Sequence, residues 1–260
     1  MECAVVIARV VSPARGVRWL ADGWRMFRVA PLGWLALVVG YWLAMTLLGL
    51  IPVLGLVAAS LLVPAFSVGF MAASRAASRG QRLELPMLFA GFRERVPAQL
   101  VLGVAYFAGL ALAIGGSMLA DEGTLARWML TGQRPENDVP DEVLVAMGAA
   151  AALYLPVMMM LWFAPLLVAW HAMAPAKALF YSFVACLLNW RAFLAYGLVV
   201  ACIALLLPAA VLLLLSLVSG GASQVSPLTL MFPLLLILLP TLLASFYASF
   251  RDVFEAKQDT

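Results

Sequence analysis

Basic residues are distributed very unevenly around the six long apolar runs of this 260-residue chain. All but two of its 16 Lys and Arg residues lie in segments that fall on one side of a membrane if every run crosses it. Short loops rich in Lys and Arg stay on the cytoplasmic side of a bacterial membrane. The asymmetry therefore predicts membrane-spanning helices, with both termini in the cytoplasm.

The apolar runs have the length that a bilayer demands. The chain is 65% apolar and only 11% charged, whereas a soluble domain is about half apolar and about a quarter charged. A helical run of twenty residues is about 30 Å long, which matches the hydrocarbon core of a bilayer. Six spanning helices are expected, at residues 31–50, 53–73, 97–120, 144–170, 192–218 and 227–250.

The only sizeable extracytoplasmic segment is the loop 121–143. It holds the two remaining arginines, Arg127 and Arg134, among six acidic residues. Its Gly and Pro residues indicate an irregular solvated loop, with about one helical turn around residues 125–129.

A short amphipathic segment precedes the first span. Val17, Leu20, Trp24 and Phe27 recur at helical spacing, and the polar Arg18, Asp22 and Arg25 lie on another face. This pattern is typical of a helix that lies at the membrane interface, with arginines near lipid phosphates. Similar patterns precede the third and fifth spans, at residues 85–96 and 179–187.

These segments combine into a unit of interfacial helix, outgoing span and returning span, which occurs three times. The units cover about 17–73, 83–170 and 176–250, and their spacing is about 70 residues once the loop 121–143 is removed. The returning spans carry Pro64, Pro165 and Pro240 in similar positions. Each proline can kink its helix, so three kinks at one depth could shape a common central feature, although proline is also simply tolerated in membrane helices. We therefore expect an all-α membrane protein with six transmembrane helices in three pseudo-repeated hairpins, forming a single integral domain over residues 1–260.

The sequence offers little material for catalysis. No Asp, Glu, Lys or Arg lies at mid-depth in any span, which argues against a proton pump, because such residues persist there mainly where function needs them. The single histidine, His171, is better read as an interfacial polar residue than as a pH-sensitive group. Cys3, Cys186 and Cys202 show no spacing typical of a zinc site or a disulfide framework. We expect no cofactor, no metal and no enzymatic activity.

The lipid bilayer is the expected partner, and nucleic acid is not, because no solvated basic domain is present. Anionic headgroups could contact eight arginines, although these residues could equally serve only to fix topology: Arg18, Arg25, Arg28, Arg75, Arg79, Arg82, Arg93 and Arg95.

Three short motifs carry a resemblance to a known group. The stretches at 23–27 (GWRMF), 176–182 (AKALFYS) and 189–194 (NWRAFL) resemble an uncharacterised group of bacterial multi-pass inner-membrane proteins. That group is similar in pattern to YciC-like proteins and to the membrane domain found beside some glycerophosphodiesterases. The resemblance implies a bacterial inner-membrane location and carries no established activity or site residue.

The leading hypothesis is a non-catalytic scaffold, lipid-associating or regulatory component of the membrane. The alternative is a transporter or channel with a pathway between the helical repeats. A lipid-modifying enzyme is the weakest hypothesis, because only Glu84, Glu94 and His171 could act at headgroup level.

Overall fold

The computed structural model describes residues 7–51, 53–132, 141–218 and 227–255, and these are helical apart from short connections. Six of the helices in these ranges are long and apolar enough to cross a membrane. They are α2 (Pro31–Gly49), α3 (Leu54–Ser78), α4 (Val96–Asp121), α6 (Asp141–His171), α8 (Trp190–Val218) and α9 (Pro227–Phe254). The expected all-α class with six spans is confirmed.

Four shorter helices lie before or between the spans. The helices α1 (Pro13–Val29) and α7 (Pro175–Leu188) and the 3-10 helix η1 (Leu85–Phe92) stand before α2, α8 and α4, where amphipathic segments were expected. The fourth, α5 (Thr124–Thr131), lies in the predicted extracytoplasmic loop and is longer than the single turn expected there. The remainder of that loop, residues 133–140, lies outside the described residues.

The chain folds as two compact units, each assembled from separate stretches of sequence. Unit 1 draws on residues 1–44, 68–90 and 185–260, and unit 2 on residues 45–67 and 91–184. These boundaries do not follow the three expected repeats. The threefold repeat and the single integral domain stay predictions.

In unit 1, α1 packs directly against α8 and α9. The backbones come close together because glycines of α1 face α8 and α9. A Cβ atom on Gly16 would meet the backbone carbonyl of Ala192, and one on Gly23 would lie 2.7 Å from the Ser245 backbone nitrogen. Next to these glycines, Trp19 is buried with its ring centroid 5.3 Å from that of Phe193. Small residues at a helix contact bring the backbones together and increase van der Waals packing.

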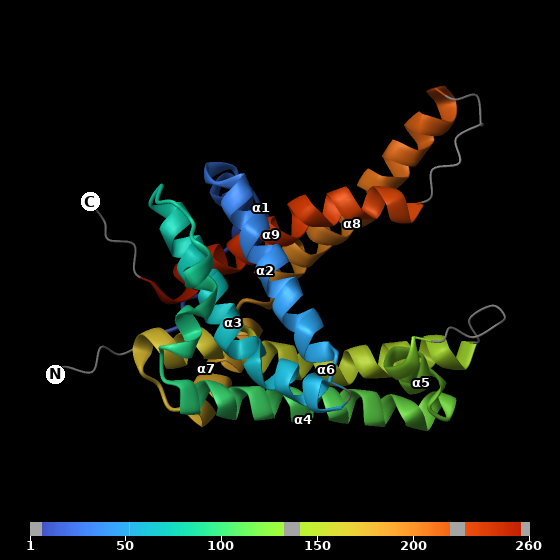
Figure 1. Ribbon diagram of the computed structural model, residues 1–260, viewed down its shortest axis with the longest axis horizontal. Helices are drawn as coiled ribbons and strands as arrows, with labels where there is room; N and C mark the ends of the chain where they lie inside the picture. Colours follow the sequence, from blue (N-terminus) through green and yellow to red (C-terminus); the bar gives the residue numbers. More distant parts are fainter. Residues whose placement is uncertain (1–6, 52, 133–140, 219–226, 256–260) are drawn as a thin grey trace. The chain divides into compact units, whose positions relative to one another are not determined.

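In unit 2, α4 and α6 lie side by side in opposite directions (Figure 1). The end of α4 is fixed to α5 by Asp121, whose carboxylate accepts hydrogen bonds from the backbone N–H groups of Gly123 (3.0 Å) and Leu125 (2.6 Å). These bonds satisfy donors that the start of a helix leaves unpaired, so Asp121 explains why α5 begins where it does. Leu125 packs with Val143 and Ala146 of α6.

The segments α1, η1 and α7 each pack on one of the helices α9, α3 and α6. The segment α1 packs on α9, and η1 packs on α3, where a Cβ on Gly69 would meet the Leu88 backbone. The third segment, α7, inserts the Ser182 hydroxyl into α6, where it donates to the Met159 carbonyl (2.7 Å) and accepts from the Phe163 N–H (2.8 Å). In an unbroken α-helix these two backbone groups bond each other. Ser182 therefore ties α7 to the turn of α6 just before Pro165.

Candidate functional site

A polar cleft of about 730 Å3 opens in unit 1, where the start of α1 meets the end of α9. Ionisable side chains supply most of its lining. They are Arg9, Arg15, Arg18, Asp22, Arg25, Arg251, Asp252 and Glu255, and Val10, Val11 and Ser12 complete it. We call this feature the arginine cleft.

Helical spacing places the charged residues of α1 in the cleft. Arg15, Arg18, Asp22 and Arg25 are separated by three or four positions, so they share one face of the helix. The neighbouring face carries the glycines and aromatic residues that contact α8 and α9. The packing that buries this face therefore leaves a row of charges along its edge.

Asp252, in the last turn of α9, joins the two helices. Its Oδ2 atom accepts a hydrogen bond from Arg15 Nε at 2.7 Å and from Trp19 Nε1 at 2.8 Å. The side chain of Asp252 is only 14% exposed and that of Arg15 is 30% exposed. Hydrogen bonds to charged groups that are this well covered are the strong ones, at about 1.5–3 kcal/mol each.

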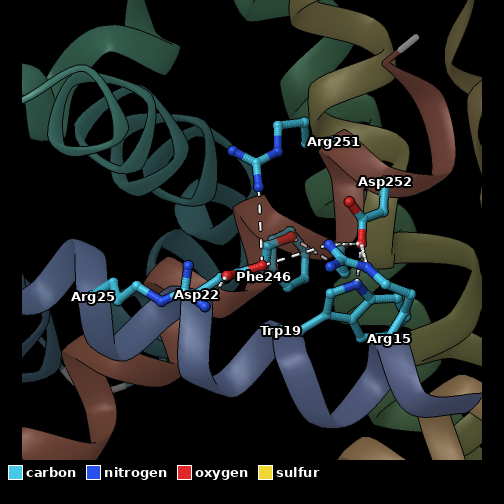
Figure 2. A network of polar contacts seen from close by, with 8 residues as sticks. Arg15, Trp19, Asp22, Arg25, Phe246, Arg251 and Asp252 are labelled. Carbon is cyan, nitrogen blue, oxygen red and sulfur yellow. Dashed lines mark hydrogen bonds and ion pairs between the residues drawn. The ribbon is translucent and has the colours of Figure 1, made fainter. Parts of the chain in front are cut away.

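Asp22 is the second carboxylate of the cleft and forms longer ion pairs than Asp252 does. It lies 3.2 Å from Arg25, 3.5 Å from Arg15 and 3.9 Å from Arg251, measured between side-chain nitrogen and oxygen atoms. Figure 2 shows Asp22 with Arg25 and Arg251 around it, while Asp252 lies beside Arg15 and Trp19. The guanidinium groups of Arg25 and Arg251 are exposed, and pairs of this kind contribute at most about 1 kcal/mol each.

The residues before α1, Arg9–Val11, form one wall of the cleft and are held by backbone hydrogen bonds. The Arg9 N–H donates to the Val253 carbonyl of α9 at 2.9 Å. The buried side chain of Asn189 accepts from the Val11 N–H at 2.8 Å and donates to the Arg9 carbonyl at 2.9 Å. We call residues 9–11 the N-terminal strap.

The cleft carries more positive than negative charge. Five guanidinium groups line it against three carboxylates, so two positive charges are not neutralised by its own acids. Guanidinium groups present planar, forked donors that match phosphate oxygens. Chemically, the arrangement is suited to holding an anion.

A probable inner membrane protein of Burkholderia thailandensis is 39% identical to this chain over 257 residues, which cover 95% of this chain and 94% of the relative. The chain belongs to the family of that inner membrane protein. No family model matches the sequence, and no solved structure matches it. The expected membership of an inner-membrane protein group is confirmed, and the relative's name gives no activity.

The structure of this family member gathers only some of the predicted arginines. Arg18 and Arg25 line the arginine cleft, whereas Arg28, also on α1, is not among its lining residues and has its guanidinium 5.9 Å from the Trp24 ring. The others are dispersed at the ends of α3 and before α4: Arg79, Arg82, Arg93 and Arg95 are exposed and Arg75 is partly buried. Whether these residues contact headgroups stays a prediction.

Sequence reasoning did not single out several cleft residues of this inner-membrane protein. Arg9, Arg15 and Arg251 were read as determinants of topology, and the carboxylate of Asp252 was not considered. One available signal was the spacing of charges at 15, 18, 22 and 25, which continues the charged face of α1 toward its start.

The three prolines of the returning spans lie inside helices and are buried. Pro64 is within α3, Pro165 within α6 and Pro240 within α9. Further prolines occur inside these helices, at Pro156 of α6 and Pro233 of α9, so the three are less distinctive than the sequence suggested. A common central feature shaped by them stays a prediction.

Proposed function

We propose that this protein is a non-catalytic, lipid-associating component of the bacterial inner membrane that contacts anionic headgroups through arginines at the ends of its spans. One observation carries the proposal. The arginine cleft holds five guanidinium groups against three carboxylates, at the end of α9 and beside an amphipathic helix. A basic site of this kind at the membrane surface attracts anionic lipid.

Pairs of basic and aromatic side chains support placement of these ends at the headgroup level. Arg28 lies 5.9 Å from the Trp24 ring, Lys177 5.4 Å from the Tyr181 ring, and Arg191 5.4 Å from the Trp190 ring. Trp and Tyr concentrate at membrane interfaces, and cations near their faces are attracted to the ring. Each pair lies in a short helix or at the start of a span.

The proposed orientation follows from the same charges. Both termini and the arginine cleft would face the cytoplasm, where the leaflet surface is negative and each nearby Lys or Arg contributes about 1 kcal/mol of attraction. The α5 segment would face the opposite side.

The test is lipid enrichment around the intact protein. The protein would be reconstituted in nanodiscs of equal phosphatidylcholine and phosphatidylglycerol content, released gently, and examined by native mass spectrometry. We expect phosphatidylglycerol to be retained several-fold over phosphatidylcholine, with the preference weakening at high salt because exposed charges are screened. Equal retention of both lipids would overturn the proposal.

One observation favours the alternative, a transporter or channel. Gln99 of α4 is 1% exposed, its Nε2 donates to the Pro165 carbonyl at 2.9 Å, and its Oε1 has no hydrogen-bond partner in the described structure. A buried acceptor without a donor costs free energy unless water or a ligand satisfies it. Modification of a Gln99→Cys variant by a small water-soluble thiol reagent in intact membranes would favour a hydrated pathway, and complete protection would argue against one.

A further inference from the structure

Two of the five cleft arginines have no internal counter-ion. Arg15 is committed to Asp252, and Arg25 and Arg251 lie near Asp22. Within the described residues, Arg9 and Arg18 make no ion pair, and both are exposed. The excess charge of the cleft is therefore concentrated on these two side chains.

The backbone of Arg9 is held in place although it lies outside the helices. The N-terminal strap is tied on one side to the end of α9, through Val253, and on the other to the start of α8, through Asn189. Asn189 is 1% exposed and uses both ends of its amide on the strap. A wall that is ordered before a ligand arrives loses less entropy on binding.

Along α1, the charged row is long enough for more than one phosphate. From Arg15 to Arg25 the helix rises about 15 Å, at about 1.5 Å per residue. An apolar rim lies next to the charges, since Val10 of the strap is 68% exposed and Val17 of α1 is 44% exposed. Charged donors beside exposed apolar side chains match a lipid, which carries its phosphate next to acyl chains.

We propose that the arginine cleft is a specific site for a phospholipid with two phosphates in one headgroup, of the cardiolipin type. Arg9 and Arg18 supply the two uncompensated charges, while Asp252 fixes Arg15 as part of the frame. Asn189 is a positioning residue that holds the strap and touches no ligand. This inference rests on the proposed association with anionic lipid and goes further, because it assigns one site, a stoichiometry of one and a preference for two phosphates over one.

The test compares two matched pairs of substitutions in the full-length protein. Arg9→Gln with Arg18→Gln removes the unpaired charges of the cleft, and Arg79→Gln with Arg82→Gln removes two exposed arginines of unit 1 outside it. Native mass spectrometry would follow each protein in a mixture of cardiolipin, phosphatidylglycerol and phosphatidylcholine. We expect the wild type to retain one cardiolipin with a preference of about tenfold over phosphatidylglycerol. The cleft pair should lose this preference, and the control pair should keep it.

The outcomes separate the two proposals. An equal loss of cardiolipin preference in both double variants would show that lipid is attracted diffusely by the whole basic surface. That result would overturn the cleft site and leave the proposed lipid association intact. No anionic lipid retained by the wild type would overturn both. Displacement of the lipid by inorganic diphosphate at matched phosphate concentration would identify a soluble anion as the ligand and overturn the lipid assignment.

An Asn189→Ala variant tests the strap without changing charge. We expect a lower cardiolipin preference in protein that still shows a cooperative thermal transition. A variant that melts cooperatively and keeps the full preference would overturn the positioning role.

Discussion

Trp19 and Asp252 are joined by a hydrogen bond of 2.8 Å although they are 233 positions apart in the chain. The indole N–H of the first helix meets the carboxylate of the last, and the same oxygen also accepts from Arg15. Trp19 is 1% exposed, so its N–H would otherwise be buried without an acceptor. One carboxylate thus satisfies a buried donor and neutralises a guanidinium at the edge of the arginine cleft.

Substitutions at Asp252 should separate these two roles. Asp252→Asn keeps an acceptor for Trp19 but removes the charge opposite Arg15, and Asp252→Ala removes both. We expect Asp252→Ala to lower the free energy of unfolding by about 2–4 kcal/mol and Asp252→Asn by less, because losing one partner leaves the other unpaired. Thermal unfolding in mild detergent measures both. Equal effects of the two variants would mean that the indole bond contributes nothing.

Gly23 should tolerate no side chain. A Cβ there would meet the Thr241 carbonyl and lie 2.7 Å from the Ser245 backbone nitrogen, so Gly23→Ala must push α1 away from α9. We expect a loss of about 1–3 kcal/mol in the free energy of unfolding, as for other overpacked contacts. Gly197→Ala in α8 is the control, since nothing lies within 4 Å of its Cβ position. It should be neutral or slightly stabilising, because alanine favours a helix.

The behaviour of these glycines also shows what the sequence could and could not predict. Six spans are evident from apolar length and charge, since both follow from local composition. The sequence pattern placed Val17, Leu20, Trp24 and Phe27 on one apolar face of α1, but packing within the protein divides this face. Leu20 and Phe27 are buried, whereas Val17 and Trp24 are 44% and 41% exposed. A hydrophobicity pattern does not mark glycines as buried. Gly16 and Gly23 are nevertheless buried, because they allow α1 to pack closely against α8 and α9.

The cleft could be predicted only in fragments. The charges on one face of α1 are a local pattern and are visible in the sequence. The pairing of Arg15 with Asp252 joins residues 237 apart, and no local pattern specifies which carboxylate a guanidinium will meet. The N-terminal strap could not be predicted from the sequence either. The role of Asn189 depends on backbone groups of Arg9 and Val11, which are 180 and 178 positions away.

Ser182 should be important for stability although it lies in a short connecting helix. Its hydroxyl bonds two backbone groups of α6, and the residue is fully buried. Ser182→Ala removes the hydroxyl that bonds the Phe163 N–H and the Met159 carbonyl. We expect the free energy of unfolding to fall by about 1–3 kcal/mol. Ser67→Ala is a suitable control, because that hydroxyl donates only to the Pro64 carbonyl of its own helix. If both variants unfold like the wild type, the Ser182 hydroxyl does not contribute to stability.

Cys186 should make the protein less stable in alkali. Burial raises the pKa of its thiol from 9.0 to about 12. The folded thiol therefore keeps its proton between these values while the unfolded thiol releases it, so rising pH favours unfolding there. We expect a decline of up to about 1.4 kcal/mol per pH unit above pH 9. The slope should be smaller in Cys186→Ala, measured by chemical denaturation at pH 8, 9 and 10; identical slopes would show that the thiol does not contribute.

The orientation of the protein can be decided with two single-cysteine variants, made after the native cysteines are replaced by serine. Gln81 follows α3 and Thr131 ends α5, and both residues are exposed. With basic segments inside, a membrane-impermeant thiol reagent should label Thr131→Cys on intact spheroplasts and reach Gln81→Cys only after the membrane is permeabilised. The opposite pattern would place the arginine cleft outside the cytoplasm. In that case the anionic surface of the cytoplasmic leaflet could not supply its ligand, and the cleft would have to be tested against anions of the periplasmic side.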